Sequence, residues 1–111
     1  MRVIAVVNQK GGVAKTTSTY NLAAIKALSG KKTVMIDLDP QASLTISCGY
    51  DPDNKDFFNC RIDDVLLDET SISECCFSID SLDKYGKVFD NLSLVPSSLQ
   101  LSKVEKEINN I

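Results

Sequence analysis

The 111-residue sequence lacks histidine and contains only three prolines and 6% aromatic residues. Without histidine, none of the metal sites that combine cysteine with histidine can form. The four cysteines do not follow a Cys-x-x-Cys spacing, so we expect reduced thiols with mostly structural roles. These cysteines are Cys48, Cys60, Cys75 and Cys76.

Long apolar runs and an excess of charge are missing as well. No stretch of 18 apolar residues exists, which predicts that nothing spans a membrane, and the N-terminus does not read as a secretory leader. We therefore expect a cytoplasmic protein with no membrane partner. Twelve basic and fifteen acidic residues give a net charge of -3, so any polyanion must be bound locally rather than attracted by the whole chain.

The remaining composition is that of one globular domain. Hydrophobic residues make up 43% and charged residues 24% of the chain, which excludes a disordered polymer and a collagen-like repeat. A chain of this length can hold a hydrophobic core but not a second domain.

The order of the hydrophobic patterns predicts an α/β fold. Val3–Val7 is a continuous apolar run, typical of a strand buried on both faces of a parallel sheet. A helix is expected from Thr16 to Ser29-Gly30, and a second strand over Thr33–Ile36. Strand, helix and strand in this order form a βαβ unit with parallel strands. The apolar side of the expected helix comprises Tyr20, Ala23, Ala24, Ala27 and Leu28.

The patterns are weaker in the second half of the chain. Pro96 ends an expected strand, Ser97-Ser98 can cap an expected helix, and Gly86 is the expected turn of a loop. The expected elements are a short helix around Ile62–Leu66, a loop or hairpin over Ser78–Asp90, a strand over Leu92–Val95, and a final helix with Leu101, Val104, Ile108 and Ile111 on its apolar side.

A glycine-containing segment, residues 9–17, lies between the first expected strand and the first expected helix. Backbone N–H groups in such a turn form a nest for anions, and the helix N-terminus adds a partial positive charge. Gly11 and Gly12 allow close approach of the backbone to phosphate groups. Lys15 can reach β- and γ-phosphate oxygens, and the Thr16 hydroxyl can ligate Mg²⁺. The segment is a candidate phosphate-binding loop.

Two other interpretations of this segment remain open. A pair of glycines flanked by lysines can form a solvated turn, although a strand before it and a helix after it favour a phosphate site. A dinucleotide site would instead use Asp37, at the end of the second expected strand, to bind ribose. The Gly-x-Gly-x-x-Gly pattern is absent, however, and Lys15 and Thr16 would have no role in such a site.

Residues 10–17 read Lys-Gly-Gly-Val-Ala-Lys-Thr-Thr and closely resemble the deviant Walker A motif, Lys-Gly-Gly-x-Gly-Lys-Thr-Thr, of the ParA/MinD superfamily of ATPases. The resemblance implies a P-loop NTPase-like fold of three layers, α/β/α, with a parallel sheet, of which residues 1–111 would be the N-terminal part. It implies ATP and Mg²⁺ as cofactors, and Lys10 and Lys15 as catalytic residues, with Lys10 reaching the partner's ATP across a dimer. The implied nucleotide-binding residues are Lys10, Gly11, Gly12, Val13, Ala14, Lys15, Thr16 and Thr17.

A second segment, Asp37–Thr45, is similar to switch I of the ParA branch, which reads Asp-x-Asp-Pro-Gln-Gly-x-x-Thr. By that resemblance Asp39 is the catalytic acid that positions or deprotonates the attacking water, and Asp37 supports Mg²⁺ through water. The implied metal site comprises Thr16, Asp37 and Asp39. A pair of exposed turn acids is the plain alternative. The segment Leu92–Leu101 also looks like the strand and turn of ParA/Soj partition proteins.

The chain is therefore expected to be the N-terminal portion of a ParA/Soj-type partition ATPase, serving chromosomes or plasmids as an ATP-dependent homodimer. Nonspecific DNA, a ParB-like adaptor and a nucleoid location are implied for the parent protein. Two departures concern hydrolysis: the chain has no Walker B segment, and Ala14 replaces a glycine, at a cost of about 1 kcal/mol if that position needs positive φ. The alternatives are a nucleotide-binding fragment without hydrolysis, an interaction module that only dimerises, and a Min-type membrane-positioning ATPase.

Overall fold

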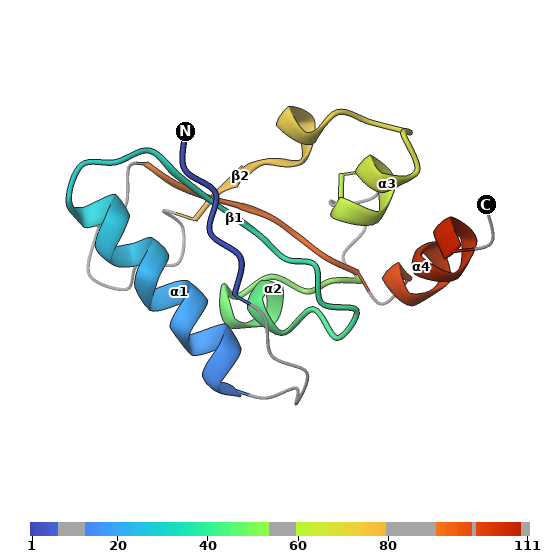
Figure 1. The fold of residues 1–111 in the computed structure, drawn as a ribbon, viewed down its shortest axis with the longest axis horizontal. Helices are drawn as coiled ribbons and strands as arrows, with labels where there is room; N and C mark the ends of the chain where they lie inside the picture. Colours follow the sequence, from blue (N-terminus) through green and yellow to red (C-terminus); the bar gives the residue numbers. More distant parts are fainter. Residues whose placement is uncertain (7–12, 54–59, 80–90, 99, 110–111) are drawn as a thin grey trace.

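The structure is a computed structural model that describes residues 1–6, 13–53, 60–79, 91–98 and 100–109 (Figure 1). Both helices and short strands occur along these ranges, as expected for an α/β chain. No helix among the described residues is long and apolar enough to cross a membrane. The elements are α1 (Val13–Leu28), β1 (Thr33–Ile36), α2 (Ser43–Ser47), α3 (Ile62–Leu66), the 3-10 helix η2 (Ile72–Cys75), β2 (Phe77–Ser78), β3 (Leu92–Val95) and α4 (Leu101–Asn109).

The described strands form one sheet in the order β1-β3-β2. β1 and β3 are parallel, with Thr33 opposite Leu92 and Ile36 opposite Val95, which confirms both predicted strands. β2 is antiparallel to β3, so the small sheet is mixed. An antiparallel pair is also what a hairpin over residues 78–90 would produce. The expected turn at Gly86 lies outside the described residues.

The prediction of an N-terminal strand is wrong for the described part of Val3–Val7. Residues 1–6 are not assigned to a strand, and Val3 and Ile4 are 82% and 51% exposed. A strand buried on both faces needs a neighbouring strand and a layer on each side. In the described sheet, β3 is flanked by β1 and β2, and the described residues neither pair with residues 1–6 as a strand nor cover their apolar side chains.

Helix α1 begins at Val13, three residues before the predicted start at Thr16. Its end is as predicted: Gly30 has φ 90°, and the N–H groups of Gly30 and Lys31 donate to the carbonyl oxygens of Ala27 and Lys26. This pattern is a Schellman motif, in which glycine takes the left-handed position. The predicted apolar side is confirmed at Ala23 and Ala27, which are buried, but not at Leu28, which is 63% exposed.

Two hydrophobic clusters lie on opposite faces of β3. Leu92 and Leu94 belong to the first cluster, with α1, β1 and α2, whereas Val95 belongs to the second, with α3, η2 and α4. Alternate residues of a strand point to opposite faces, so helices pack on both sides of β3. The first cluster comprises Ala23, Ala27, Met35, Leu44, Cys48, Ile79, Leu92 and Leu94, and the second comprises Ile62, Cys75, Val95, Leu101 and Val104.

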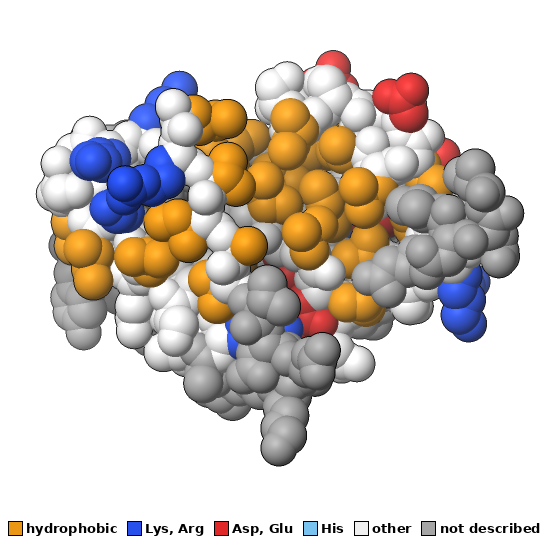
Figure 2. Space-filling model, in the orientation of Figure 1, with side chains coloured by type: hydrophobic (Ala, Val, Ile, Leu, Met, Phe, Trp, Pro, Cys, Tyr) orange, Lys and Arg blue, Asp and Glu red, His pale blue; other side chains and the backbone are white. Residues whose placement is uncertain are grey.

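One face of β1 remains open. Met35 is buried beneath α1, while its neighbours Val34 and Ile36 are 46% and 43% exposed. Figure 2 shows hydrophobic side chains gathered across the middle of the molecule. In α4, Leu101 and Val104 are buried as predicted, whereas the predicted packing of Ile108 and Ile111 lies outside the described side chains.

All four cysteines are free, and Cys48 and Cys75 are fully buried. Burial, with a smaller contribution from the negative charge of Asp37, raises the pKa of Cys48 from 9.0 to about 12. Burial, with smaller contributions from Cys60 and Asp64, raises the pKa of Cys75 to about 11. Because these thiols lie in the two hydrophobic clusters, their raised pKa values make the free energy of unfolding depend on pH.

We expect the free energy of unfolding to fall as the pH rises from 9 to 12. In the unfolded chain the Cys48 thiol ionises near 9.0, but in the folded chain it stays protonated until about 12, so the unfolded state binds fewer protons in this window. Urea unfolding across this range should show a shallower pH slope for Cys48→Ala than for the unmodified protein. The control is Cys76→Ala, which removes a partly buried thiol packed against the second cluster. Equal pH slopes of the unfolding free energy in all three proteins would contradict the prediction.

Candidate functional site

The first turn of α1 carries the described part of the candidate phosphate loop. Lys15 and Thr16 are half-buried, and Thr17 is exposed. The first turn contains no acidic residue, so nothing there opposes the positive end of the helix dipole. The predicted placement of Lys15 in the first helical turn is confirmed. Lys10, Gly11 and Gly12 lie outside the described residues.

The backbone at Ala14 differs from the expectation that this position could require positive φ. Ala14 is the second residue of α1, and a right-handed helix has negative φ, which alanine adopts more readily than any other residue. The described non-glycine residues with positive φ are Ala42 and Asp68. The penalty considered for Ala14 therefore does not arise from its backbone.

The Asp37 side chain organises the chain that leaves β1. It is 3% exposed, and its Oδ1 accepts a hydrogen bond from the Asp39 N–H at 3.0 Å. Its Oδ2 accepts two more, from the Thr45 N–H at 2.9 Å and from the Thr45 hydroxyl at 2.6 Å. The Asp37 N–H donates to the Val95 oxygen at 3.1 Å. The 37–45 segment is thereby folded back on itself beside the end of β3.

Asp39 differs from Asp37 in its exposure and its bonding. It is half-buried, and its Oδ1 accepts one hydrogen bond, from the Gln41 N–H at 3.0 Å. Its backbone oxygen accepts the Ala42 N–H at 2.8 Å, and Ala42 itself has φ 55° and is fully buried. A left-handed alanine is strained; this position is a glycine in the switch motif that the segment resembles. The interpretation as two exposed turn acids does not fit Asp37.

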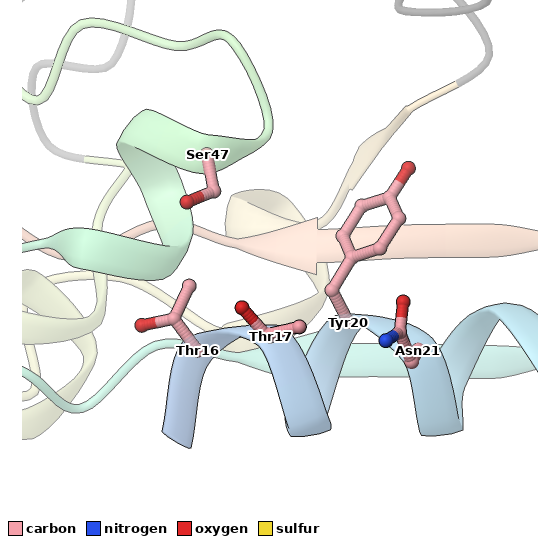
Figure 3. A pocket seen from close by; sticks show the side chains of 5 residues that line it. All are labelled: Thr16, Thr17, Tyr20, Asn21 and Ser47. Atoms are coloured by element: carbon pink, nitrogen blue, oxygen red, sulfur yellow. The ribbon is translucent and has the colours of Figure 1, made fainter. Parts of the chain in front are cut away.

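A cavity of about 190 Å³ lies beside the candidate phosphate loop. It lies between the first half of α1 and the short helix α2, which begins within the 37–45 segment and ends at Ser47 (Figure 3). Hydroxyl groups from both helices face this space, and burial raises the pKa of the Tyr20 phenol at its side. The residues that line it are Thr16, Thr17, Tyr20, Asn21 and Ser47. Thr16 of the candidate phosphate loop therefore lies close to the helix that Asp37 and Thr45 hold in place.

The residues present fit a Mg²⁺ that is bound chiefly through phosphate and water. Among the described residues, no group of three acidic, cysteine or histidine side chains is arranged to hold a metal. Mg²⁺ in nucleotide sites commonly takes one or two protein oxygens, with phosphate and water completing its shell. A carboxylate has about four acceptor positions, and described donors fill three of those of Asp37. The fit is that of an outer-shell acid rather than a direct ligand.

The sequence matches a family model described as an AAA domain over residues 1–111. It is 35% identical to the sporulation initiation inhibitor protein Soj of Bacillus subtilis, over 96% of this chain and 38% of that protein. It is 41% identical to a ParA family protein of Chlamydia muridarum, over 95% of this chain and 37% of the relative. The chain thus spans about two fifths of the length of these relatives.

Solved structures show the same similarity. Cobyrinic acid a,c-diamide synthase from Mycobacterium smegmatis, with bound ATP analog and magnesium, aligns with a TM-score of 0.74 and 32% identity, over 93% of this chain and 37% of that one. A plasmid partition protein from Borrelia burgdorferi aligns with a TM-score of 0.68 and 28% identity, over 88% and 39% of the two chains. The described elements therefore form part of a P-loop α/β fold.

The two acids of the 37–45 segment should differ in their effect on stability. Asp37→Asn replaces one acceptor oxygen by an NH₂ group that would face N–H and hydroxyl donors in a buried site, and we expect it to lower the free energy of unfolding by about 2 to 4 kcal/mol. Asp39→Asn, in a half-buried side chain with one described partner, should cost less than about 1 kcal/mol. Urea denaturation measures both, and equal losses would contradict the assignment of Asp37 as the residue that holds the segment.

Proposed function

The chain belongs to the AAA domain family as a ParA/Soj-type member, and from this premise we propose that it supplies the phosphate-binding and water-activating half of an ATP site in a partition ATPase. The observation that carries the proposal is the proximity of two motifs: Thr16, in the first turn of α1, lines a cavity together with Ser47 of α2, the helix that Asp37 holds through Thr45. Such an arrangement would bring the proposed phosphate-binding groups and the acidic segment to the same edge of the sheet.

We propose that residues 10–17 bind the phosphate groups of ATP. The N-terminal amides of α1 lack partners within the helix and carry its positive dipole, and Lys15 adds a full charge within the same turn. Lys10 would add a second charge, from the other subunit of a dimer. The similar synthase from Mycobacterium smegmatis binds an ATP analog and magnesium, which supports the same ligands here. Mg²⁺ would be held by the Thr16 hydroxyl and would neutralise phosphate charge.

Asp39 is the residue proposed to act on the attacking water. A carboxylate can accept a hydrogen bond from that water and then its proton as the new oxygen–phosphorus bond forms. Asp39 is suited to this role because its side chain is only half-buried. Its backbone is also fixed, since its N–H donates to Asp37 Oδ1 and its carbonyl oxygen accepts the Ala42 N–H. Asp37, whose oxygens accept three hydrogen bonds, would orient the segment and bind the metal's water shell.

At the level of the whole protein, we propose a role in partitioning chromosomes or plasmids. The resemblance to Soj and ParA relatives and to a plasmid partition protein supports it. The protein would form an ATP-dependent homodimer on nonspecific DNA, with a ParB-like adaptor promoting release.

Replacing the first-turn lysine tests the nucleotide site. Lys15→Ala removes a charge-assisted contact to phosphate, so we expect the affinity of the whole protein for ATP with Mg²⁺ to fall roughly 10- to 100-fold and hydrolysis to be lost. Calorimetry with ATP and a phosphate-release assay measure the two effects separately. Lys26→Ala, in the last turn of the same helix, is the matched control. Wild-type hydrolysis by Lys15→Ala would refute the assignment.

Replacing Ala14 tests whether the departure from the family motif limits the site. Because Ala14 is helical, a penalty would have to come from contact between an alanine methyl group and bound phosphate. We expect Ala14→Gly to raise ATP affinity or the rate of hydrolysis by about fivefold, equivalent to about 1 kcal/mol. If binding and turnover are both unchanged, alanine at this position is compatible with the complete function.

A further inference from the structure

The turn between β3 and α4 makes an unexpected contact with the 37–45 segment. Ser97 is fully buried, and its hydroxyl donates a hydrogen bond of 2.7 Å to the backbone oxygen of Asp39, 58 residues away in sequence. A carbonyl oxygen can only accept, so the direction of this bond is fixed. With the Ala42 N–H as its second donor, the Asp39 oxygen has both lone pairs occupied.

The backbone of Ser97 holds a second point of the same segment. Its N–H donates to the Thr45 hydroxyl oxygen at 3.0 Å, and that hydroxyl donates to Asp37 Oδ2 at 2.6 Å. Because the N–H can only donate, the Thr45 oxygen must accept, and its single proton is directed to Asp37. Thr45 is fully buried, so water does not compete for these bonds.

The turn that carries Ser97 is itself anchored. The Val95 oxygen accepts the Asp37 N–H at 3.1 Å, and the Pro96 oxygen accepts the N–H of Ile62, at the start of α3, at 2.8 Å. Ser97 thus links the 37–45 segment to the sheet and, through the adjacent residue, to a helix on its other face. Neighbouring Ser98 is equally buried but makes a different bond: its hydroxyl accepts the Gln100 N–H at 3.2 Å.

We propose that Ser97 is a positioning residue for Asp39. Its hydroxyl fixes the Asp39 backbone, and its N–H fixes Thr45 and, through it, Asp37, so that the Asp39 carboxylate is presented at a constant place relative to α1. The role of Asp39 toward water rests on the proposed function; the restraint on the segment rests on the hydrogen bonds alone. Preorganisation of this kind matters because a displacement near 1 Å can lower a rate by about 100-fold.

The decisive comparison is between Ser97→Ala and Ser98→Ala in the whole protein. Both remove one buried hydroxyl from the same turn, but only the first releases the Asp39 oxygen. We expect Ser97→Ala to lower kcat for ATP hydrolysis by roughly tenfold with KM for ATP changed by less than about twofold. Ser98→Ala should retain kcat within about twofold. In hydrogen exchange, the amides of Ala42 and Thr45 should exchange faster in Ser97→Ala only.

Thr45 provides an independent pair of variants. Thr45→Val keeps the shape of the side chain but removes both bonds of its hydroxyl, and it should reproduce the loss of kcat and the faster exchange. Thr45→Ser keeps the hydroxyl and should restore kcat to within about threefold of the unmodified protein. A purely structural role would lower the thermal stability of Ser97→Ala and Ser98→Ala alike without separating their kcat values.

Equal kcat values in Ser97→Ala and Ser98→Ala, or unchanged exchange at Ala42 and Thr45 in Ser97→Ala, overturn the proposal. If the unmodified protein does not hydrolyse ATP, the proposed function fails, and the exchange measurement still decides the restraint: faster exchange in Ser97→Ala supports it, and unchanged exchange refutes it.

Discussion

The buried carboxylate of Asp37 is the interaction on which this part of the fold depends. Its two oxygens gather the backbone of Asp39 and both polar hydrogens of Thr45, which turns the chain back at the end of β1. The turn allows α2 to begin at Ser43, so that Leu44 and Cys48 enter the first hydrophobic cluster. Polar bonding of the segment and hydrophobic packing of α2 are therefore coupled, since α2 is too short to be stable by itself.

Local patterns predicted several elements that pack against a neighbour in the described structure, but neither α2 nor η2. β1, α3 and β3 lie where the apolar residues placed them, and α1 ends at the predicted glycine. The strand predicted at Val3–Val7 failed because an apolar run indicates a preference for burial without supplying the partner. The antiparallel β2 and the exposure of Leu28 likewise depend on which elements meet, which no local pattern contains.

The candidate site was predictable to different degrees. The sequence placed Lys15 and Thr16 near the start of a helix and Asp37 and Asp39 after a strand, as the structure has them; their roles stay predictions. The strained backbone of Ala42 had a signal in the sequence, namely the glycine that the switch motif has at that position. The bond from Ser97 to Asp39 had no such signal: it spans 58 residues, and a serine after a strand is equally well explained as a helix cap.

The two acids at the end of β1 illustrate how burial separates the roles of identical side chains. A carboxylate enclosed by N–H and hydroxyl donors has most of its acceptor positions occupied and is held in one orientation, so its value lies in fixing other groups. A carboxylate two residues further along, half-buried and with one described partner, keeps positions at which water can bind. The proposed chemistry needs both acids. An acid that activates water must be accessible to it, and an accessible acid on a loop must be held in position by a buried group.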